Sequence, residues 1–421
     1  MEMHAFGRLI PMATARHRLM MATRPMDRIE QVRVESAFGR VVAEVVRSPQ
    51  AVPSFSRASW DGYALRSADT RRATRSRPVD LAVVGEVYAE QTFPGTVHPG
   101  ESVAIATGGA LPRGADTVVI FEDVTRRGDR VRIPHPVPVG DRIASPGDDF
   151  ARGAVLVRPR TELTPAALAM IAACGMPTVR VRARPVVAIV PNGNELLSPG
   201  ATARVGRIYE SNNASLAAVV QAAGGIPRTF PPVVDDPDRI ESVLRRALRE
   251  ADLVLATGGS SVGERDHLPR VLPRLGRLLF HGVAVRPGKP TLAAQVGHRV
   301  VVGMPGHPSS CLSNAYWLLI PLIRRLAGRR GPGWVDGEAR LVRGTLEPAP
   351  GFSTVVPLSA GHGGVYSRYH GSSSISSLAG SVGFTVVPPG RTPIVSGSKI
   401  RVHWLLPPLG PGAGPFASRN G

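Results

Sequence analysis

The stretch that decides the fold reads Asp252-Leu-Val-Leu-Ala-Thr-Gly-Gly-Ser-Ser-Val-Gly-Glu-Arg-Asp266. Its apolar start runs straight into a glycine-rich turn, which is typical of a buried parallel strand with a loop at its carboxyl end. Three similar apolar runs flank it, at 185–190, 226–234 and 299–302. Helix-like segments separate the runs, at 212–223, 239–251 and 309–326. Strands alternating with helices predict an α/β unit with a mainly parallel sheet at 183–330.

Smaller β-rich units are expected on both sides of this α/β unit. Short apolar runs punctuated by Pro and Gly indicate a β-rich domain at 79–143, and similar strands recur at 335–406. Residues 161–174 contain a plausible helix start at Thr164 and predict a short apolar helix. We expect the ends of the chain to be a loose leader at 1–26 and a flexible tail at 407–421.

The composition predicts a cytoplasmic, multi-domain α/β protein. The chain has 421 residues, of which 43% are hydrophobic, so it can bury sizeable cores. No stretch has the roughly 20 uninterrupted apolar residues of a membrane span. The best candidate, 311–323, is interrupted by Ser313, Asn314 and Pro321. The start of the chain lacks the ordered regions of a signal peptide.

The strong positive charge has two interpretations. The net charge is +19, and lysine occurs only at Lys289 and Lys399, so arginine supplies nearly all of it. A coding bias explains this skew most simply, whereas a functional reading would require an anionic partner. Aromatic residues make up only 5% and do not alternate with basic ones, which argues against nucleic-acid binding. The two cysteines, Cys174 and Cys311, lie in apolar contexts and are predicted to be buried free thiols.

Three loops carry motifs that suit anion binding. In the opening stretch, glycines at 258, 259 and 263 allow backbone N–H groups to approach a phosphate, with Asp266 nearby, although an ordinary glycine turn looks the same. The loop 304–310 leads into a helix whose first turn holds serines, a potential anion site or a plain cap. The loop 285–290 contains Lys289, where a compact ammonium is retained in an arginine-rich chain.

Acidic residues next to Gly or Pro turns form a further candidate set. They are Asp61, Asp148, Asp149, Glu195, Asp235 and Asp236. Oxygen ligands on loops suit Mg²⁺ bound together with a phosphate substrate. Taken singly, each is also a common turn former.

In combination, these stretches resemble the molybdopterin molybdenumtransferase family, the MoeA proteins and the related domain of gephyrin. The resemblance covers about 33–405. The matching pieces, in chain order, are FSRASWDGYAL (55–65), IATGGALPRGADTVVIFE (105–122), GDDFARGAVL (147–156), PVVAIVPNGNELLSPG (185–200), IYESN (208–212), 252–266, 285–290 and 303–310.

The resemblance implies an elongated homodimer of four-part subunits. A MogA-like α/β domain would occupy 183–330, and an extended linking and dimerisation domain would combine 27–50 with 145–182. The β-rich domain at 51–144 would reach over the partner's active site, and a β-barrel-like domain would close the chain at 331–406.

The implied reaction inserts molybdate into adenylylated molybdopterin, with Mg²⁺-dependent cleavage of the adenylate. The residues that match catalytic positions are Asp61, Thr107, Glu195, Asp235 and Asp266, of which the last three would hold the metal. Those that match substrate-binding positions are Asp149, Gly258, Gly259, Ser260, Gly263, Arg286, Lys289, Pro305, Gly306, Pro308, Ser310, Ser376 and Ser377. Expected partners are a MogA-type adenylyltransferase and downstream molybdoenzymes, without nucleic acid or membrane.

Several positions depart from the family pattern. They are Asn194 in place of an acid, Ala144 and Gly282 in place of cations, Arg286 in place of a lysine, and His307 in place of an asparagine. No clear match to a family arginine occurs in 351–356. Two alternatives therefore remain: a non-catalytic paralogue that acts as a molybdopterin-binding scaffold, and an enzyme for a related adenylylated or phosphorylated molecule.

Overall fold

The central sheet of the α/β unit has six strands. Their order is β16 (Ile226–Thr229), β13 (Val186–Pro191), β17 (Leu253–Thr257), β21 (Arg299–Met304), β20 (Leu292–Val296) and β18 (Arg277–His281). The first four strands are parallel, which confirms the predicted sheet. β20 runs antiparallel to both of its neighbours, β21 and β18, and neither β20 nor β18 was predicted. This computed structural model describes residues 8–263 and 266–405.

Alternating side chains of the parallel strands build two cores. Val187 and Ile189 of β13 pack in one cluster with α4 (Asn212–Ala222). Ala188 and Val190 point to the other face and pack in a cluster with α5 (Pro237–Glu250) and α6 (Leu268–Leu275). Strands that are apolar on both faces require helices on both sides, as the sequence pattern indicated.

The helical stretch predicted at 309–326 consists of three consecutive segments. They are α7 (Pro308–Asn314), the π-helical η3 (Ala315–Leu319) and α8 (Ile320–Leu326). Nearly all of their side chains are buried, and they pack in the same cluster as α4. No helix in the described part of the chain has the length and apolar character needed to cross a membrane.

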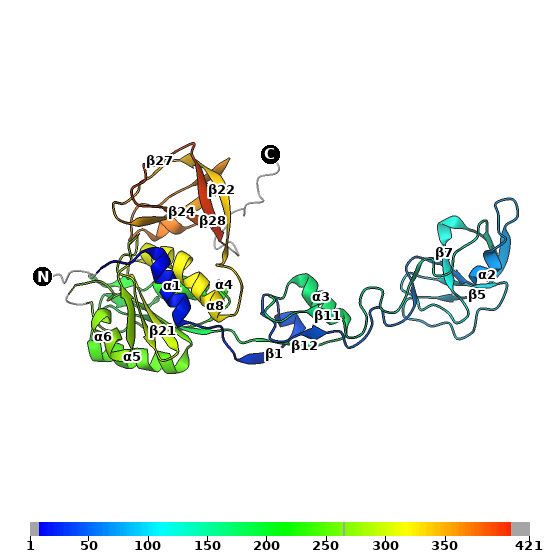
Figure 1. The fold of residues 1–421 in the computed structure, drawn as a ribbon, viewed down its shortest axis with the longest axis horizontal. Helices are drawn as coiled ribbons and strands as arrows, with labels where there is room; N and C mark the ends of the chain where they lie inside the picture. Colours follow the sequence, from blue (N-terminus) through cyan, green and yellow to red (C-terminus); the bar gives the residue numbers. More distant parts are fainter. Residues whose placement is uncertain (1–7, 264–265, 406–421) are drawn as a thin grey trace.

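The molecule is elongated, with the α/β unit near one end and the β-rich domain at the other (Figure 1). The sheet of the β-rich domain has the order β7 (Thr117–Ile120), β4 (Gly62–Leu65), β6 (Glu101–Ile105), β5 (Val79–Val87), β9 (Arg130–Ile133) and β8 (Thr125–Arg127). The connection is a narrow linking domain with its own small core. It contains β1 (Ile29–Arg33), β12 (Thr178–Arg182), β2 (Val46–Arg47), β11 (Val155–Val157) and α3 (Pro165–Ala173).

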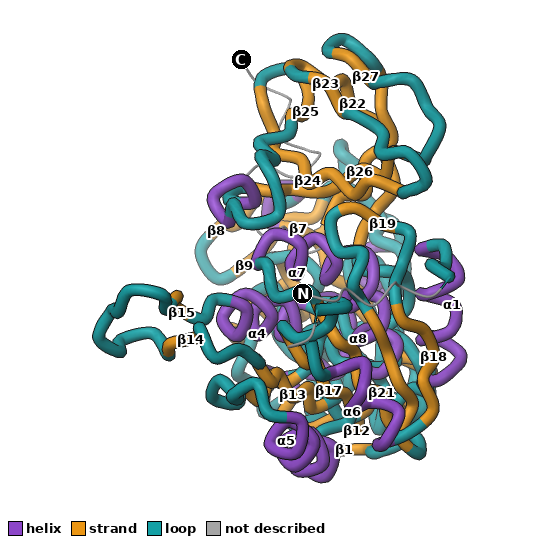
Figure 2. The backbone as a smooth tube through the Cα atoms, turned by 90° about the vertical axis from the view of Figure 1, so that its left-hand side faces the viewer, coloured by secondary structure: helices purple, strands orange, loops and turns teal. Residues whose placement is uncertain are grey.

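The C-terminal strands form a closed sheet stacked on the α/β unit (Figures 1 and 2). Their order is β24 (Ser353–Gly361), β25 (Gly364–Tyr366), β22 (Trp334–Arg343), β28 (Lys399–Leu405) and β26 (Ser381–Val387). Pairing of β26 with β24 closes the ring, and β19 (Val285–Arg286) adds to β24. Through β19, the candidate cation loop of the α/β unit is joined to this barrel.

The N-terminal segment is structured, which corrects the expectation of a loose leader at 1–26. Residues from 8 onward are described, and Met12–Ala22 form helix α1, whose Ala15 and Leu19 are fully buried in the core of the α/β unit. Ile10 also forms a bridge with Val283. Only two side chains in this helix are deeply buried, so its apolar pattern in the sequence is weak. The predicted tail at 407–421 lies outside the described residues.

Candidate functional site

Three loops at the carboxyl ends of β13, β17 and β21 meet at one edge of the parallel sheet. Gly258 has φ +82°, and a side-chain Cβ there would lie 2.2 Å from the backbone oxygen of Asn192. The Gly258 N–H donates to the Met304 carbonyl at 3.2 Å, and a Cβ on Gly306 would lie 3.3 Å from the Gly258 Cα. Glycine therefore allows backbone to touch backbone at the place where an α/β sheet usually binds its ligand.

Asn194 and Asp235 join the loop after β13 to the segment after β16. The Asn194 N–H donates to Asp235 Oδ2, and the Asp235 N–H donates to Asn194 Oδ1, both at 3.1 Å. Asn194 thus makes the hydrogen bond that an aspartate oxygen would make, without the negative charge. Glu195 is exposed beside this pair and precedes β14 (Leu196–Leu197), which projects with β15 (Ile208–Tyr209) from the domain (Figure 2).

The predicted metal ligands do not form a preassembled metal centre. Asp266 Oδ2 accepts the Gly263 N–H at 2.9 Å and so closes the glycine-rich loop on itself. Within 8–263 and 266–405, no three His, Cys, Asp or Glu side chains come together to hold a metal ion. The structure therefore does not bring Glu195, Asp235 and Asp266 together. These oxygen donors fit Mg²⁺ only in a site that substrate phosphates and water complete, which is a common arrangement for this ion.

A buried hydrogen-bond network holds the loop that carries Arg286 and Lys289. Asn314 Nδ2 donates to Thr291 Oγ1 at 2.7 Å and to the Gly288 carbonyl at 3.2 Å. The indole of Trp317 donates to Asn314 Oδ1 at 2.9 Å. Gly288 has φ +107°, and a Cβ there would collide with the Asn314 amide.

The loop thereby presents two cations in different surroundings. Arg286 is exposed, and its guanidinium stacks 4.7 Å from the centre of the Phe352 ring. Lys289 is half-buried. Both side chains can meet an anion of high charge, one as a planar fork and the other as a compact ammonium.

The loop after β21 contacts the C-terminal domain at the start of α7. The Ser309 hydroxyl donates to the Gly371 carbonyl at 2.9 Å and is therefore engaged, whereas the neighbouring Ser310 is buried. Ser377 is also buried and donates to the Ser374 carbonyl at 2.6 Å. Ser376 is exposed, which makes it the better of the two C-terminal candidates for contact with a ligand. Pro305 is buried, and His307 is exposed before Pro308.

Asp61 and Thr107 form a second cluster in the β-rich domain. The Thr107 N–H and hydroxyl donate to Asp61 Oδ1 at 2.6 and 2.9 Å. Both hydrogen bonds lower the pKa of Asp61, and the bond from the Thr107 N–H has the larger effect. The carboxylate is exposed and charged, ready to accept further hydrogen bonds. Asp149 is exposed in the linking domain, where its N–H donates to the Val52 carbonyl.

The two clusters lie far apart within one chain. The sheet containing β5 and β7, from which Asp61 and Thr107 project, is at the opposite end of the molecule from β21 (Figure 1). The linking domain separates them. One chain therefore does not bring the complete set of predicted catalytic residues together.

Two positioning residues escaped the sequence analysis. Glu210 is buried and accepts the N–H groups of Asn212 at 2.7 Å and Asn213 at 3.0 Å. Burial raises the pKa of Glu210, and these two hydrogen bonds partly offset the increase. Asn212 Nδ2 donates to the Gly306 carbonyl at 2.9 Å and so fixes the loop after β21. The signal was present in the motif IYESN at 208–212, to which no role had been given.

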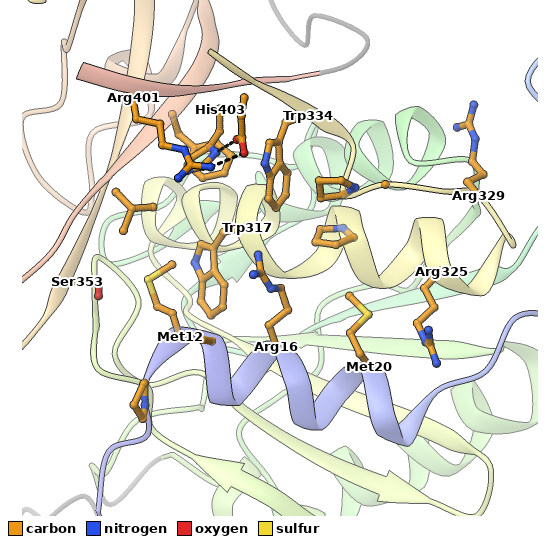
Figure 3. A pocket seen from close by; sticks show the side chains of 18 of the residues that line it. Met12, Arg16, Met20, Trp317, Arg325, Arg329, Trp334, Ser353, Arg401 and His403 are labelled. Carbon is orange, nitrogen blue, oxygen red and sulfur yellow. Dashed lines mark hydrogen bonds and ion pairs between the residues drawn. The ribbon is translucent and has the colours of Figure 1, made fainter. Parts of the chain in front are cut away.

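A sizeable cavity lies away from these loops (Figure 3). It measures about 870 Å³ and is bounded by α1, α8 and the C-terminal domain. Apolar side chains such as Met12, Trp317 and Trp334 line it together with arginines. None of the predicted site residues lines this cavity.

Comparison with family models gives two matches. Residues 10–175 match the MoeA N-terminal region (domain I and II), and residues 188–325 match a probable molybdopterin binding domain. The second match contains the loops after β13, β17 and β21. The first contains Asp61 and Thr107.

Relatives and solved structures cover nearly the whole chain. The molybdopterin molybdenumtransferase of Bacillus subtilis is 32% identical over 384 residues, which span 89% of each protein. That of a Nostoc species is 31% identical over 89% of this chain and 88% of its own length. The crystal structure of a molybdopterin biosynthesis MoeA protein from Pyrococcus horikoshii aligns with a TM-score of 0.82 at 31% identity, covering 94% of this chain and 99% of the other. The chain belongs to the molybdopterin molybdenumtransferase family.

Proposed function

We propose that this protein is a transferase of molybdenum cofactor biosynthesis that inserts molybdate into adenylylated molybdopterin and releases the adenylate. The carrying observation is the close approach of three glycine-containing loops at the carboxyl ends of β13, β17 and β21. Family membership over most of the chain supports the same reaction. The proposal includes action as a homodimer in the cytoplasm.

The loops suit the two anions that such a reaction brings together. Backbone N–H groups that follow Gly258 in this loop, around Gly259 and Ser260, bind the pyrophosphate, because glycine lets this ligand approach the main chain closely. Arg286 and Lys289 bind molybdate, a tetrahedral dianion that matches charged hydrogen-bond donors. Ser310 and Ser376 supply neutral donors from two domains. The Asn314 network holds both cations on one rigid loop.

Acidic residues at the rim of the loops bind the metal ion that acts on the departing phosphate. Glu195, Asp235 and Asp266 contribute oxygen ligands to Mg²⁺ shared with the substrate. When bound, the ion offsets negative charge on the pyrophosphate. Asp61, which accepts both Thr107 donors, orients Thr107 and presents a carboxylate to the same site from a second copy of the chain.

AMP release from adenylylated molybdopterin, with Mg²⁺ and with or without molybdate, tests the proposal. We expect release that depends on molybdate in the wild-type protein and is lost in Asp61→Ala and Glu195→Ala. Asp129→Ala, which removes an exposed carboxylate elsewhere in the β-rich domain, is the matched control and should remain active. Bound pterin without any AMP release would refute the transferase and establish the scaffold alternative.

A further inference from the structure

A crevice between the linking domain and the α/β unit carries a concentration of positive charge. It has a volume of about 510 Å³, and its walls come from the loop 38–41, the end of α4 and the chain after α8. Five arginines line it: Arg40, Arg182, Arg184, Arg324 and Arg329. Glu162 is the only acidic side chain among the described residues of its lining.

The guanidinium groups are held mostly by the protein itself. Glu162 pairs with Arg329 and lies 3.8 Å from Arg324. Arg184 donates to the carbonyls of Gly224 and Gly225, at 3.4 and 2.6 Å, beyond the end of α4. Arg40 pairs with Glu30 and also donates to the Arg182 carbonyl at 2.8 Å, and Arg182 lies 3.6 Å from Asp27. Among the described residues, five arginines thus meet three carboxylates, those of Glu30, Asp27 and Glu162, and two positive charges remain that only backbone carbonyls and water can offset.

Much of this surplus positive charge is buried. The side chains of Arg40, Arg324 and Arg329 are only 12 to 14% exposed. Burial lowers the pKa of Arg184, and the charges of Arg40 and Arg329 lower it further, while the charge of Glu30 offsets part of the decrease. Arg329 Nε is buried and has no hydrogen-bond partner within the described residues. Like charges gathered away from water are costly unless an anion joins them.

We propose that this crevice is a binding site for a phosphate group, supplied as free phosphate or by a small phosphate-bearing molecule. Arginine is the residue best suited to tetrahedral oxyanions, because its planar fork donates two parallel hydrogen bonds. The site is separate from the loops after β13, β17 and β21, which lie at the carboxyl ends of the strands. Since its walls belong to two domains, bound phosphate stiffens their junction.

Isothermal titration calorimetry of the full chain with inorganic phosphate, in chloride buffer of constant ionic strength, tests this site. We expect saturable binding that is weakened about tenfold in Arg184→Gln and in Arg329→Gln, since each variant removes one charged donor. Glu162→Gln should bind several-fold more tightly, because it removes the one lining carboxylate that competes with phosphate for Arg329. A misfolded variant could not show this increase in phosphate affinity.

Two control variants locate the binding site. Lys289→Ala changes the proposed molybdate loop, and Arg180→Gln removes an exposed arginine of β12 that pairs with Glu44. Arg180→Gln should bind phosphate as the wild-type protein does, and Lys289→Ala should keep the binding event that Arg329→Gln weakens. Parallel titrations with pyrophosphate and AMP distinguish the source of the phosphate. Tighter binding of AMP would indicate a phosphate attached to a larger molecule, and tighter binding of the inorganic ions would indicate free phosphate. Absence of saturable binding, loss in Lys289→Ala but not in Arg329→Gln, or weaker binding in Glu162→Gln would overturn the proposal.

Discussion

Asn314 is the residue on which the cation loop depends. It bonds to Thr291, Gly288 and Trp317 at once, inside the core. We expect Asn314→Ala to lower the free energy of unfolding by about 2–4 kcal/mol, because it leaves several buried polar groups unsatisfied. Urea denaturation measures the change. The loop that carries Lys289 should loosen as well, which hydrogen exchange of its backbone would detect.

The neighbouring Ser313 offers a matched control. Its buried hydroxyl has no hydrogen-bond partner among the residues described. Ser313→Ala should therefore change the free energy of unfolding by less than about 1 kcal/mol, since no bond is lost. Equal losses in Asn314→Ala and Ser313→Ala would mean that packing of α7, and not the hydrogen-bond network, accounts for the stability.

The raised pKa of Glu210 predicts the direction in which the free energy of unfolding changes with pH. Burial raises its pKa above the ordinary value, so the folded protein binds this proton more tightly than the unfolded chain does. The stability that Glu210 contributes is full below its ordinary pKa and is lost as pH rises through the raised value. The Glu210→Gln variant has no carboxyl group to titrate at this position, so it does not lose stability in this way. Its stability relative to wild type should therefore improve as pH rises above about 4, the ordinary pKa of a glutamate.

Glu250 provides the opposite case for the same measurement. Its hydrogen bond with Arg246 lowers its pKa, so its contribution is present at neutral pH and is lost as pH falls. Urea unfolding of Glu250→Gln across the same pH range should show the reverse trend. Parallel trends in the two variants would contradict the assignment for Glu210.

At the scale of elements, Gly258 sets how closely the loops after β13 and β17 approach. We expect Gly258→Ala to cost more than about 2 kcal/mol, because it adds a backbone collision to an unfavourable positive φ. Gly200→Ala is the control, since Gly200 has φ +92° with open space around it, and should cost only about 1 kcal/mol. Thermal unfolding compares the two. Equal losses of stability in the two variants would show that the loops can move apart to accept the added methyl group without strain.

Strands buried on both faces were the elements most readily predicted from sequence. The runs that became β13, β17 and β21 are continuous and apolar, and the helices between them begin and end at clear signals. The edge strand β18 and its neighbour β20 were missed, because Arg277 and His281 leave only three apolar residues in β18 and Gln295 interrupts the apolar run of β20. Helix α1 was missed because it contributes only two deeply buried side chains.

The candidate site was predictable in its parts but not in its assembly. Motifs gave the glycine turns and the loop with Lys289, because these follow from local backbone needs. The partners of Glu210 and Asn212 could not be read, since those contacts join segments far apart in sequence. Spacing along the chain also could not show that Glu195, Asp235 and Asp266 do not come together as one group.

At the scale of the whole molecule, the elongated shape has a functional consequence. Asp61 and Thr107 belong to the β-rich domain at one end of the elongated molecule. The loops after β13, β17 and β21 lie near the other end (Figure 1). If all of them serve one reaction, a second chain must supply one of the two clusters. A two-fold dimer meets this need, because each subunit then gives its β-rich domain to the other.

Mixed dimers purified with two different tags test this arrangement through AMP release. A dimer of one Asp61→Ala chain and one Glu195→Ala chain has one intact site if the clusters combine between subunits, so we expect about half of the wild-type activity. It has none if each chain works alone. The reciprocal dimer, one wild-type chain with one chain carrying both substitutions, reverses the outcome: it is inactive if the sites are shared and half active if they are not. Activity in the reciprocal dimer would therefore refute the shared site, and variants that simply misfold could not give half activity in the first dimer.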